Sequence, residues 1–471
     1  MKKEHSELFK TIVNSYVNGT LESDVENILS KYNYNKENLC GIISSLCGVE
    51  VICDSNNFIE NLSNAIKSYS SQHKIVNKIK DCSMDCKKEG GKTFCQNSCP
   101  FDAILINKET NSTYIDTEKC TDCGFCVEAC PTGSILDRIE FIPLVDILKS
   151  NVPVIATVAP AITGQFGENV SIHQLRSALK KIGFSDMIEV AFFADMLTLK
   201  EAIEFDHLVK NKDDLMITSC CCPMWVAMVR RVYEDLVKYV SPSVSPMIAS
   251  GRVLKALNPN CKVVFIGPCI AKKAEAKEKD LQGDIDFVLT FSELKDIFDS
   301  LNIDISKMPE DFSSEYASRG GRLYARTGGV SIAVEDVVKR LFPEKEKFLK
   351  AIQGNGVVEC KKLLSKAQEG KLGANFIEGM GCIGGCVGGP KSIIPKELGK
   401  EKVDQFANNS SIKIPIDSPC MDNILRKLNI DSAEDFKIPE KNKKYLKENF
   451  KIKYINFVFY KHPVIILLAI L

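Results

Sequence analysis

The cysteines of this chain stand in short clusters on segments that are far apart in the sequence. Three of these segments lie in its second half: TSCCCPMW at residues 218–225, GPCIAKKAE at residues 267–275 and EGMGCIGGC at residues 378–386. Each segment places soft thiolates beside glycine or proline, which bend the backbone, and beside hydrogen-bond donors. Thiolates that must meet from distant loops constrain a fold strongly. We interpret them as ligands of one buried iron–sulfur site.

Composition narrows the class of protein. The 471 residues are enough for about three domains and a large core. Lys plus Arg and Asp plus Glu each total 61, so the charge balance does not indicate a nucleic-acid partner. The 20 cysteines are too diluted for a small disulfide scaffold. Their C-x-x-C and C-x-x-x-C spacings indicate metal ligation in a reducing compartment, which we expect to be the cytoplasm.

Neither end of the sequence predicts a secretion signal or a membrane span. The first residues are charged, and no apolar stretch follows them. At the other end, residues 457–460 and 464–471 are apolar, but Lys461, His462 and Pro463 separate the two runs. Each run is too short to cross a bilayer. We expect a buried or disordered apolar tail at residues 451–471, with a peripheral membrane anchor as the alternative.

Hydrophobic periodicity divides the remaining chain into three parts. Residues 1–78 have apolar residues at helical spacing and predict a small helical module. We interpret its cysteines, Cys40, Cys47 and Cys53, as buried small hydrophobic residues, with a redox or metal role as the alternative. Residues 79–140 predict an α+β ferredoxin-like domain. Residues 141–450 predict an α/β domain with two lobes of mixed, largely parallel sheets and flanking helices.

The α/β domain shows its strands as apolar runs. The strand candidates are residues 152–161, 187–193, 215–218, 263–266 and 287–289, and the helix candidates are residues 173–182, 223–240 and 292–301. Functional loops in parallel sheets lie at the carboxyl ends of the strands. The loops that carry residues 220–222 and Cys269 follow predicted strands directly, which is the position that functional loops take.

A cysteine pattern at residues 120–131 is typical of cubane clusters. Three thiolates at C-x-x-C-x-x-C spacing hold one cluster, and a fourth, before proline, reaches a second cluster. An earlier half at residues 82–100 also ends in Cys-Pro but departs from the tight spacing. We assign two [4Fe-4S] clusters: one on Cys99, Cys120, Cys123 and Cys126, the other on Cys82, Cys86, Cys95 and Cys130. The alternative is a zinc ribbon, which would be redox silent.

The three downstream motifs resemble those of [FeFe]-hydrogenases, over roughly residues 79–445, in the form of a divergent branch found in anaerobic bacteria such as clostridia. APA at residues 159–161, ADM at 194–196 and TGGV at 327–330 add to the resemblance. The chain departs from the better-known pattern, which has two adjacent cysteines, Met before Pro-Cys, Ala before the third-motif Cys and a longer glycine run.

The resemblance implies an H-cluster, in which a [4Fe-4S] cubane joins a diiron subsite carrying carbon monoxide, cyanide and an azadithiolate. The implied cubane ligands are Cys222, Cys269, Cys382 and Cys386, and Cys386 would also bridge to the diiron unit. Lys272 matches a family lysine that donates to a cyanide. The residues that would line the pocket are Ala159, Pro160, Pro268 and Met380.

The triple cysteine leaves two assignments open. Counting back from Pro223 makes Cys222 the cubane ligand and Cys221 the proton-transfer thiol. Counting forward from Thr218 makes them Cys221 and Cys220. We favour the first, because the residue before a proline is held in extended geometry.

The resemblance also implies a proton relay from that thiol through Glu275, Glu204 and Glu201. The i, i+3 spacing puts Glu201 and Glu204 on one helix face. The alternative for such a pair is an ordinary solvated face.

These expectations describe an oxidoreductase, a ferredoxin-type [FeFe]-hydrogenase that converts protons and electrons reversibly to H2. Reduced ferredoxin or flavodoxin would exchange electrons with it, and maturation proteins would build the diiron subsite. We expect no nucleic-acid or membrane partner. One alternative is a hydrogenase-like iron–sulfur cluster assembly protein, which shares the cubane ligands without the diiron centre. The other is a hydrogen sensor with low turnover, which usually carries an added signalling module.

Overall fold

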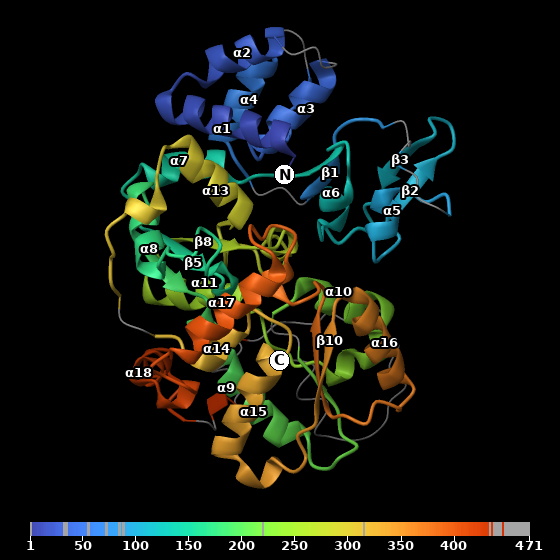
Figure 1. Cartoon of the computed structure of the whole chain (residues 1–471), viewed down its shortest axis with the longest axis vertical. Coiled ribbons are helices and arrows are strands. Elements are labelled where there is room, and N and C mark those ends of the chain that lie inside the picture. The colour runs from blue at the N-terminus through green and yellow to red at the C-terminus, as the bar shows by residue number, and fades with distance from the viewer. Residues whose placement is uncertain are drawn as a thin grey trace.

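The computed structural model describes residues 2–31, 36–53, 57–70, 74–82, 86, 90–218, 221–313, 316–432, 435–436 and 445–446. The predicted apolar tail at 451–471 and the residue Cys220 lie outside this part of the chain. Figure 1 shows a helical module at the N-terminal end, a small domain with short strands beside it, and a larger domain of helices and strands. The boundaries at residues 78, 140 and 450 stay predictions.

The N-terminal module is a group of helices that packs on the larger domain. The helices are α1 (Lys3–Asn18), α2 (Leu21–Lys31), α3 (Lys36–Leu46) and α4 (Phe58–Lys67). The Ser6 hydroxyl donates to Asp296 Oδ1 at 2.8 Å, and the Ser300 hydroxyl donates to the carbonyl of Lys10 at 2.9 Å. These bonds join α1 to α13 (Phe291–Ser300), so the module is docked by polar contacts as well as by its apolar face.

Two cysteines of this module form a disulfide, which the sequence analysis did not predict. Cys40 and Cys53 have Cα atoms 5.6 Å apart and are covalently joined. Cys47 is fully buried, and burial raises the pKa of its thiol to about 12. The interpretation as buried small residues therefore describes Cys47 and is corrected for the disulfide pair.

The ferredoxin-like domain contains two short strand pairs and two short helices. Its elements are β1 (Val76–Lys78), α5 (Phe94–Ser98), β2 (Ile104–Asn107), β3 (Ser112–Ile115), α6 (Phe125–Ala129) and β4 (Ile135–Asp137). β1 pairs antiparallel with β4, and β2 with β3. Cys99 caps the end of α5 and Cys130 caps the end of α6, each directly before a proline. Proline cannot continue the helix, so both halves release the chain at their Cys-Pro step.

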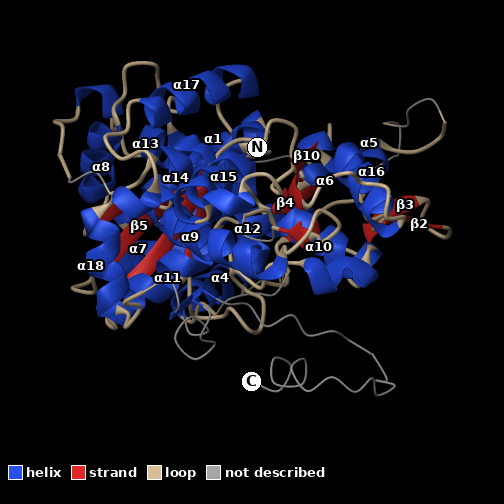
Figure 2. Ribbon diagram, turned by 90° about the horizontal axis from the view of Figure 1, so that it is seen from below, coloured by secondary structure: helices blue, strands red, loops and turns tan. Residues whose placement is uncertain are grey.

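The larger domain is built on two separate parallel sheets, which confirms the predicted α/β class. The first has the strand order β6 (Asp186–Glu189), β5 (Val154–Val158), β8 (Lys262–Gly267), β9 (Phe287–Thr290). The second has the order β10 (Ala351–Asn355), β11 (Phe376–Met380), β7 (Met216–Ile217). Figure 2 shows helices around both groups of strands. Strands that run parallel present all their carboxyl ends, and the loops that follow, at one edge.

Helices cover both sheets. The α-helices are α7 (Phe141–Leu148), α8 (Ile172–Lys181), α9 (Ala191–Leu208), α10 (Pro223–Val232), α11 (Pro246–Leu257), α12 (Ala271–Glu275), α14 (Arg319–Leu323), α15 (Gly329–Leu341), α16 (Val357–Gln368), α17 (Lys396–Asn408) and α18 (Pro419–Lys427). The 3-10 turns are η1 (Pro160–Ile162), η2 (Glu234–Tyr239), η3 (Ile305–Lys307), η4 (Pro343–Lys345), η5 (Cys386–Gly388) and η6 (Pro415–Asp417).

Two predicted boundaries are wrong. The strand expected at 187–193 ends at Glu189, and α9 begins at Ala191; the helix expected at 223–240 breaks after Val232. α9 is buried over most of its length, so its sequence is a continuous apolar run rather than a stripe. Such a run cannot be distinguished from a buried strand by periodicity.

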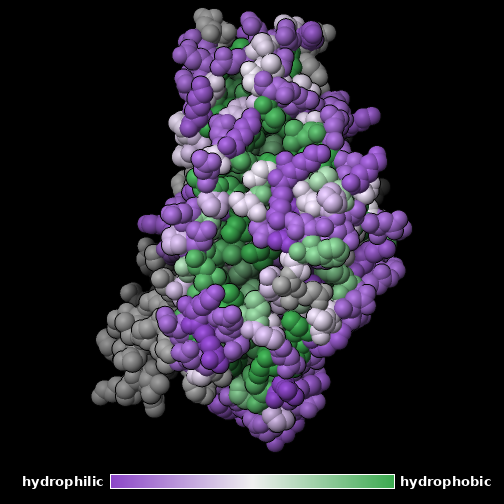
Figure 3. Space-filling view, turned by 90° about the vertical axis from the view of Figure 1, so that its left-hand side faces the viewer, coloured by the Kyte–Doolittle hydropathy of each residue, from purple (hydrophilic) through white to green (hydrophobic). Residues whose placement is uncertain are grey.

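The outer surface is mixed in character. On the face drawn in Figure 3, hydrophilic residues dominate and hydrophobic residues show in the recesses between them. Among the described residues, none of the helices combines the length and the apolar character that crossing a membrane requires.

A buried set of ion pairs joins the ferredoxin-like domain to the larger domain. Lys273 of α12 contacts Asp137 of β4 at 2.9 Å and Glu293 of α13 at 2.5 Å, and Lys391 contacts Asp137 at 3.0 Å. All four side chains are at most 4% exposed. Burial alone would lower the pKa of Lys273, but the two carboxylates raise it above its usual value. Lys273 therefore stays protonated, and the buried ions are stabilised by one another because water does not reach them.

Replacing Lys273 by methionine should destabilise the protein by about 3–5 kcal/mol, because two buried carboxylates lose a partner. The matched control is Lys295→Met, whose lysine is half exposed and pairs with Asp299 four residues later. That loss should be about 0.5 kcal/mol. Anaerobic urea unfolding measures the free energy of unfolding of both variants. Equal losses would contradict a stabilising role of the buried ion pairs.

Candidate metal centres

One cavity in the ferredoxin-like domain is lined by the four thiols predicted for the first cluster. These are Cys99, Cys120, Cys123 and Cys126, with Val76, Phe101, Ala103 and Ile104 in the apolar wall. The Ala103 N–H donates to Cys99 Sγ at 3.2 Å, and the Asp122 N–H donates to Cys120 Sγ at 3.4 Å. Thiols with N–H donors around an apolar cavity fit a [4Fe-4S] cluster, whose potential such bonds tune.

Three thiols of the second predicted set also lie near one another. Burial raises the pKa of Cys95, and the neighbouring thiols of Cys130 and Cys86 raise it further, against the Thr93 hydroxyl, which lowers it. The Ser134 N–H donates to Cys130 Sγ at 3.3 Å. The fourth predicted ligand, Cys82, lies with its thiol 3.8 Å from the hydroxyl of Thr113.

Zinc sites and cubane clusters differ in how their thiols are spaced. A structural zinc site needs four side chains that converge on a single ion. Within the described ranges, no three or more side chains of His, Cys, Asp or Glu are placed to hold one ion. The thiolates of a cubane instead bind separate iron corners, so their sulfur atoms stand further apart.

The three downstream motifs meet at the ends of parallel strands. Cys222 follows β7, Cys269 follows β8, and Cys382 and Cys386 follow β11. Burial raises the pKa of Cys382 well above its usual value, and the thiols of Cys269, Cys222 and Cys386 raise it further. Burial also raises the pKa of Cys269 to about 11 and that of Cys386 to about 12, with Cys222 as a contributing neighbour. The Cys222 thiol thus lies close enough to those of Cys269, Cys382 and Cys386 to disfavour their ionisation.

Cys221 has different neighbours from Cys222. Its Sγ lies 3.8 Å from Met380 Sδ. Cys222 Sγ accepts a hydrogen bond from the Gly381 N–H at 3.3 Å, inside the third motif. This placement favours Cys222 over Cys221 as the cubane ligand.

Lys272 is a buried cation among these thiols. Its side chain is 8% exposed and contacts Glu275 Oε2 at 2.6 Å. Burial alone would lower the pKa of Lys272, but Glu275 and the thiols of Cys269 and Cys221 raise it above its usual value. Lys272 is therefore a protonated donor in a water-poor site, where charge-assisted hydrogen bonds are strong.

The four residues predicted to line the pocket also come from strand ends. Ala159 follows β5, Pro160 begins η1, Pro268 follows β8 and Met380 ends β11. Ala159 is bonded through its N–H to the carbonyl of Ile266 in the neighbouring strand β8 at 2.9 Å. Met380 is 1% exposed. Three of the four are buried and Pro160 is half-buried, which fits an apolar wall.

Glu378 organises the third motif, a role that the sequence analysis did not assign. Its carboxylate accepts hydrogen bonds from the Gly328 N–H at 2.7 Å and from the Ser331 N–H at 2.8 Å. These groups lie at the start of α15, where the helix dipole favours a negative charge. The bonds tie the EGMGC segment to the TGGV segment.

Gly385 also lies close to the TGGV segment. It has a φ of +85°, and a Cβ at this position would lie 2.6 Å from the Thr327 nitrogen. Only glycine fits here without strain.

Two of the predicted proton carriers lie on α9, in a network of their own. Glu201 is fully buried, and both of its oxygens lie 2.9 Å from the Thr218 hydroxyl, which donates to them. Glu204 is paired with Lys200 and accepts a hydrogen bond from the Ser241 hydroxyl at 2.6 Å. Lys200 is 1% exposed and was not a predicted site residue. Its only sequence signal is the i, i+4 spacing to Glu204.

The ferredoxin-like domain touches the downstream thiols at Gly124. A Cβ on Gly124 would lie 2.3 Å from Ile270 Cδ1, and Ile270 directly follows Cys269. The thiol of Cys123 is also close enough to contribute to the raised pKa of Cys382. The first cavity and the downstream thiol group are therefore neighbours in space.

Two family models match the chain. Residues 152–390 match the family described as iron only hydrogenase large subunit, C-terminal domain. Residues 113–136 match the 4Fe-4S binding domain.

Curated relatives include both enzymes and assembly factors. The NADP-reducing hydrogenase subunit HndD of Solidesulfovibrio fructosivorans is 27% identical, over 57% of this chain and 55% of its own length. Iron hydrogenase 1 of Clostridium pasteurianum is 28% identical, over 64% of this chain and 68% of its own. Cytosolic iron-sulfur assembly component 3 of Rattus norvegicus is 23% identical, over 67% and 81%. The chain thus spans little more than half of the first of these proteins.

Solved structures share the fold. A variant of [FeFe]-hydrogenase HydA1 from Chlamydomonas reinhardtii superposes with a TM-score of 0.54 at 22% identity, over 63% of this chain and 93% of that one. The structure titled as HydA(deltaEFG), on stepwise H-cluster assembly, gives a TM-score of 0.53 at 23% identity, over 63% and 93%. At this identity the likeness concerns the fold alone.

Replacing Gly124 by alanine should destabilise the contact between the two domains. The φ of +81° strains any side chain at this position, and the added carbon would clash with Ile270. We expect a loss of about 1–3 kcal/mol in urea unfolding. Ile270→Ala in the same chain should restore part of it, with a coupling of at least about 0.5 kcal/mol. Strictly additive losses would contradict the contact.

Proposed function

Because this chain belongs to the iron-only hydrogenase large-subunit family, we propose that it is an [FeFe]-hydrogenase that interconverts protons, electrons and H2. One observation carries the proposal furthest. The thiols of Cys222, Cys269, Cys382 and Cys386 come together from three distant loops, and Lys272 lies among them as a buried, protonated donor.

The residues at this place fit an H-cluster. Cys222, Cys269, Cys382 and Cys386 would hold the cubane, and Cys386 would also reach the diiron subsite. Lys272 would donate a charge-assisted hydrogen bond to a cyanide. Ala159, Pro160, Pro268 and Met380 would keep water out. When bound, the H-cluster supplies an iron site at which protons and electrons combine, and the protein orients it and tunes its electrostatics.

The ferredoxin-like domain would deliver the electrons. Its thiols would hold two [4Fe-4S] clusters, and the close approach of Gly124 and Ile270 supports a position of the first cluster beside the downstream thiols. A reduced ferredoxin or flavodoxin fits as the external partner, and maturation proteins would insert the diiron subsite. We propose the cytoplasm as the compartment, since the thiols must stay free to bind iron.

The proton carriers of the proposal are Cys221, Glu275, Glu204 and Glu201. Glu275 stands nearest to the thiols, through its ion pair with Lys272. Glu201 and Glu204 would act from α9.

A second candidate function is iron–sulfur cluster assembly without H2 chemistry. The match to cytosolic iron-sulfur assembly component 3 over 67% of this chain supports it. The two functions need the same cubane ligands and differ in the groups beside them. Lys272 and Met380 at the thiols favour the hydrogenase, because an assembly protein without a diiron unit has no cyanide for the lysine to bind.

Cys222→Ser should remove the paramagnetic signal of the reduced cubane, because a ligand is lost. Cys221→Ser should keep that signal and lower H2 evolution by about 10²-fold or more, because a proton carrier is lost. Electron paramagnetic resonance and an assay with reduced methyl viologen measure the two effects. Loss of the cubane in Cys221→Ser with its retention in Cys222→Ser would reverse the assignment.

The choice between enzyme and assembly protein depends on the diiron subsite. Protein produced together with the maturation proteins should show infrared bands of iron-bound carbon monoxide and cyanide and should evolve H2. The Cys386→Ser variant is the matched control and should lose the bands. Wild-type protein with intact cubane signals and no such bands would be the assembly protein. Intact bands with very low turnover would instead indicate a sensor.

A further inference from the structure

Cys360 is a buried thiol that the proposed function does not use. It lies at the start of α16, is fully buried and belongs to one apolar cluster with Trp225 and Ile377. Cys222 packs against the same cluster. Burial raises the pKa of Cys360 to about 12, and the neighbouring thiol of Cys222 contributes to the rise. A thiol outside the predicted ligand set therefore lies near a predicted cubane ligand.

A single peptide group connects Cys360 to Cys222. The carbonyl of Met380 accepts hydrogen bonds from the Cys360 S–H at 3.4 Å and from the Gly356 N–H at 2.8 Å. The N–H of the same peptide group belongs to Gly381 and donates to Cys222 Sγ at 3.3 Å. The thiol, the peptide group and the ligand sulfur thus form one chain of hydrogen bonds.

The surroundings of Cys360 hold its thiol as a donor. Its sulfur lies 3.4 Å from the Met380 carbonyl and 3.5 Å from the Gly354 carbonyl. Carbonyl oxygens only accept, so the thiol supplies the proton, and its raised pKa means that it keeps this proton at neutral pH. A Cβ on Gly354 would lie 2.8 Å from the Cys360 sulfur, so the sulfur has little room to turn away on that side.

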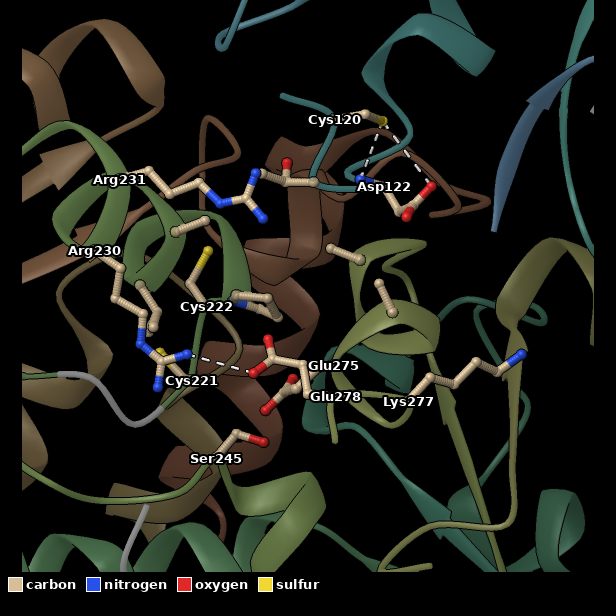
Figure 4. A pocket seen from close by; sticks show the side chains of 16 residues that line it. Cys120, Asp122, Cys221, Cys222, Arg230, Arg231, Ser245, Glu275, Lys277 and Glu278 are labelled. Carbon is tan, nitrogen blue, oxygen red and sulfur yellow. Dashed lines mark hydrogen bonds and ion pairs between the residues drawn. The ribbon is translucent and has the colours of Figure 1, made fainter. Parts of the chain in front are cut away.

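The sulfur of Cys222 has few hydrogen-bond donors. Cys222 also lines a cavity of about 320 Å³, and Figure 4 shows its side chain there with Arg230, Arg231 and Glu275 among the charged groups of the wall. Among the described residues, the Gly381 N–H is the only group that donates a hydrogen bond to this sulfur. Any change in that peptide group therefore acts directly on the ligand.

We propose that Cys360 is a positioning residue that raises the reduction potential of the cubane through the peptide group of Met380 and Gly381. Its S–H bond to the carbonyl polarises this peptide group, which then donates more strongly from its N–H. A stronger hydrogen bond to a ligand sulfur stabilises the reduced cluster, which carries one more negative charge. The cubane gains one electron from the ferredoxin-like domain, and no covalent bond of Cys360 forms or breaks. The inference rests on the cubane of the proposed function and does not need the diiron subsite.

The first test compares two substitutions that remove the same sulfur atom. Cys360→Ala and Cys360→Ser leave side chains of nearly equal size, but only serine keeps a hydrogen-bond donor. In Cys360→Ala, reduction of the cubane should become about 2–5-fold less favourable, which is a fall of roughly 20–40 mV in its midpoint potential at 59 mV per tenfold. In Cys360→Ser the potential should stay at the wild-type value or rise. Cys261→Ala, at a buried cysteine directly before β8, is the matched control and should leave the potential unchanged.

Electron paramagnetic resonance at controlled potential measures these values. The cubane signal is identified as the one that Cys222→Ser lacks. Equal potentials in Cys360→Ala and Cys360→Ser would show that only the lost volume matters and would overturn the proposal, as would a wild-type potential in Cys360→Ala. A wild-type protein without this signal would instead remove the cubane, and with it the proposed function.

A second test observes the thiol itself. In infrared difference spectra between oxidised and reduced protein, the S–H stretch of Cys360 should shift, because its hydrogen bond strengthens when the cubane gains charge. This feature should be absent from Cys360→Ala and Cys360→Ser and present in Cys261→Ala. Difference spectra in which Cys360→Ala removes no S–H feature overturn the proposal.

Discussion

The structure depends on the burial of four thiols that approach one another from loops far apart in sequence. As thiols they are tolerated in the interior, but as thiolates they repel one another and lose solvation. Burial and neighbouring sulfur therefore raise the pKa values of Cys269, Cys382 and Cys386. Only a positively charged cluster can compensate four buried thiolates. A fold that is to receive one must therefore hold the loops in place by other means. Here β7 and β11 end side by side in one parallel sheet, β8 ends in the other sheet, and Glu378 ties the third loop to the start of α15.

The same requirement explains why the ferredoxin-like domain is attached by buried charges. An apolar contact also joins the two domains, because Ile270 packs in one buried cluster with Val76 and Val127. Beside it, Lys273, Asp137 and Lys391 meet in a region that excludes water, where each ion is costly without its partners. Such an attachment gains orientation more than stability. Orientation is what electron transfer through adjacent clusters needs, since Gly124 must stay against Ile270.

The sequence could predict the parts of this design that rest on local chemistry. Cys-Pro steps end helices, and apolar runs before Cys269 and Cys222 become strands, so the class of fold and the convergence of the loops were accessible. Other parts depend on tertiary context. The strand β10 carries Gln353, Gly354 and Asn355, so it shows no apolar run and was not predicted. The buried helix α9 begins with an apolar run that was mistaken for part of a strand.

Two pairings between residues near one another in the sequence were also not predicted. The pairing of Cys40 with Cys53 looks like two buried small residues until the chain is folded. Lys200 looks like an ordinary helix lysine and proves to be a buried counter-ion of Glu204. The i, i+4 spacing allows the pair of Lys200 with Glu204, but the packing of whole elements decides that Lys200 is buried.

The helix α10 contacts the ferredoxin-like domain, the segment after α12 and the predicted cubane ligand Cys222. In α10, the Arg231 guanidinium donates to the backbone carbonyls of Glu118 and Lys119 at 3.2 and 3.3 Å, next to the first cluster ligand Cys120. Its neighbour Arg230 forms an ion pair with Glu278 at 3.4 Å, in the segment after α12. The same helix begins at Pro223, directly after Cys222. The position of α10 is thus fixed by its bonds to the ferredoxin-like domain, by the ion pair with Glu278 and by the adjacent Cys222. A shift of α10 would disturb all three together, which gives a physical reason for a rigid Pro-started helix at this place.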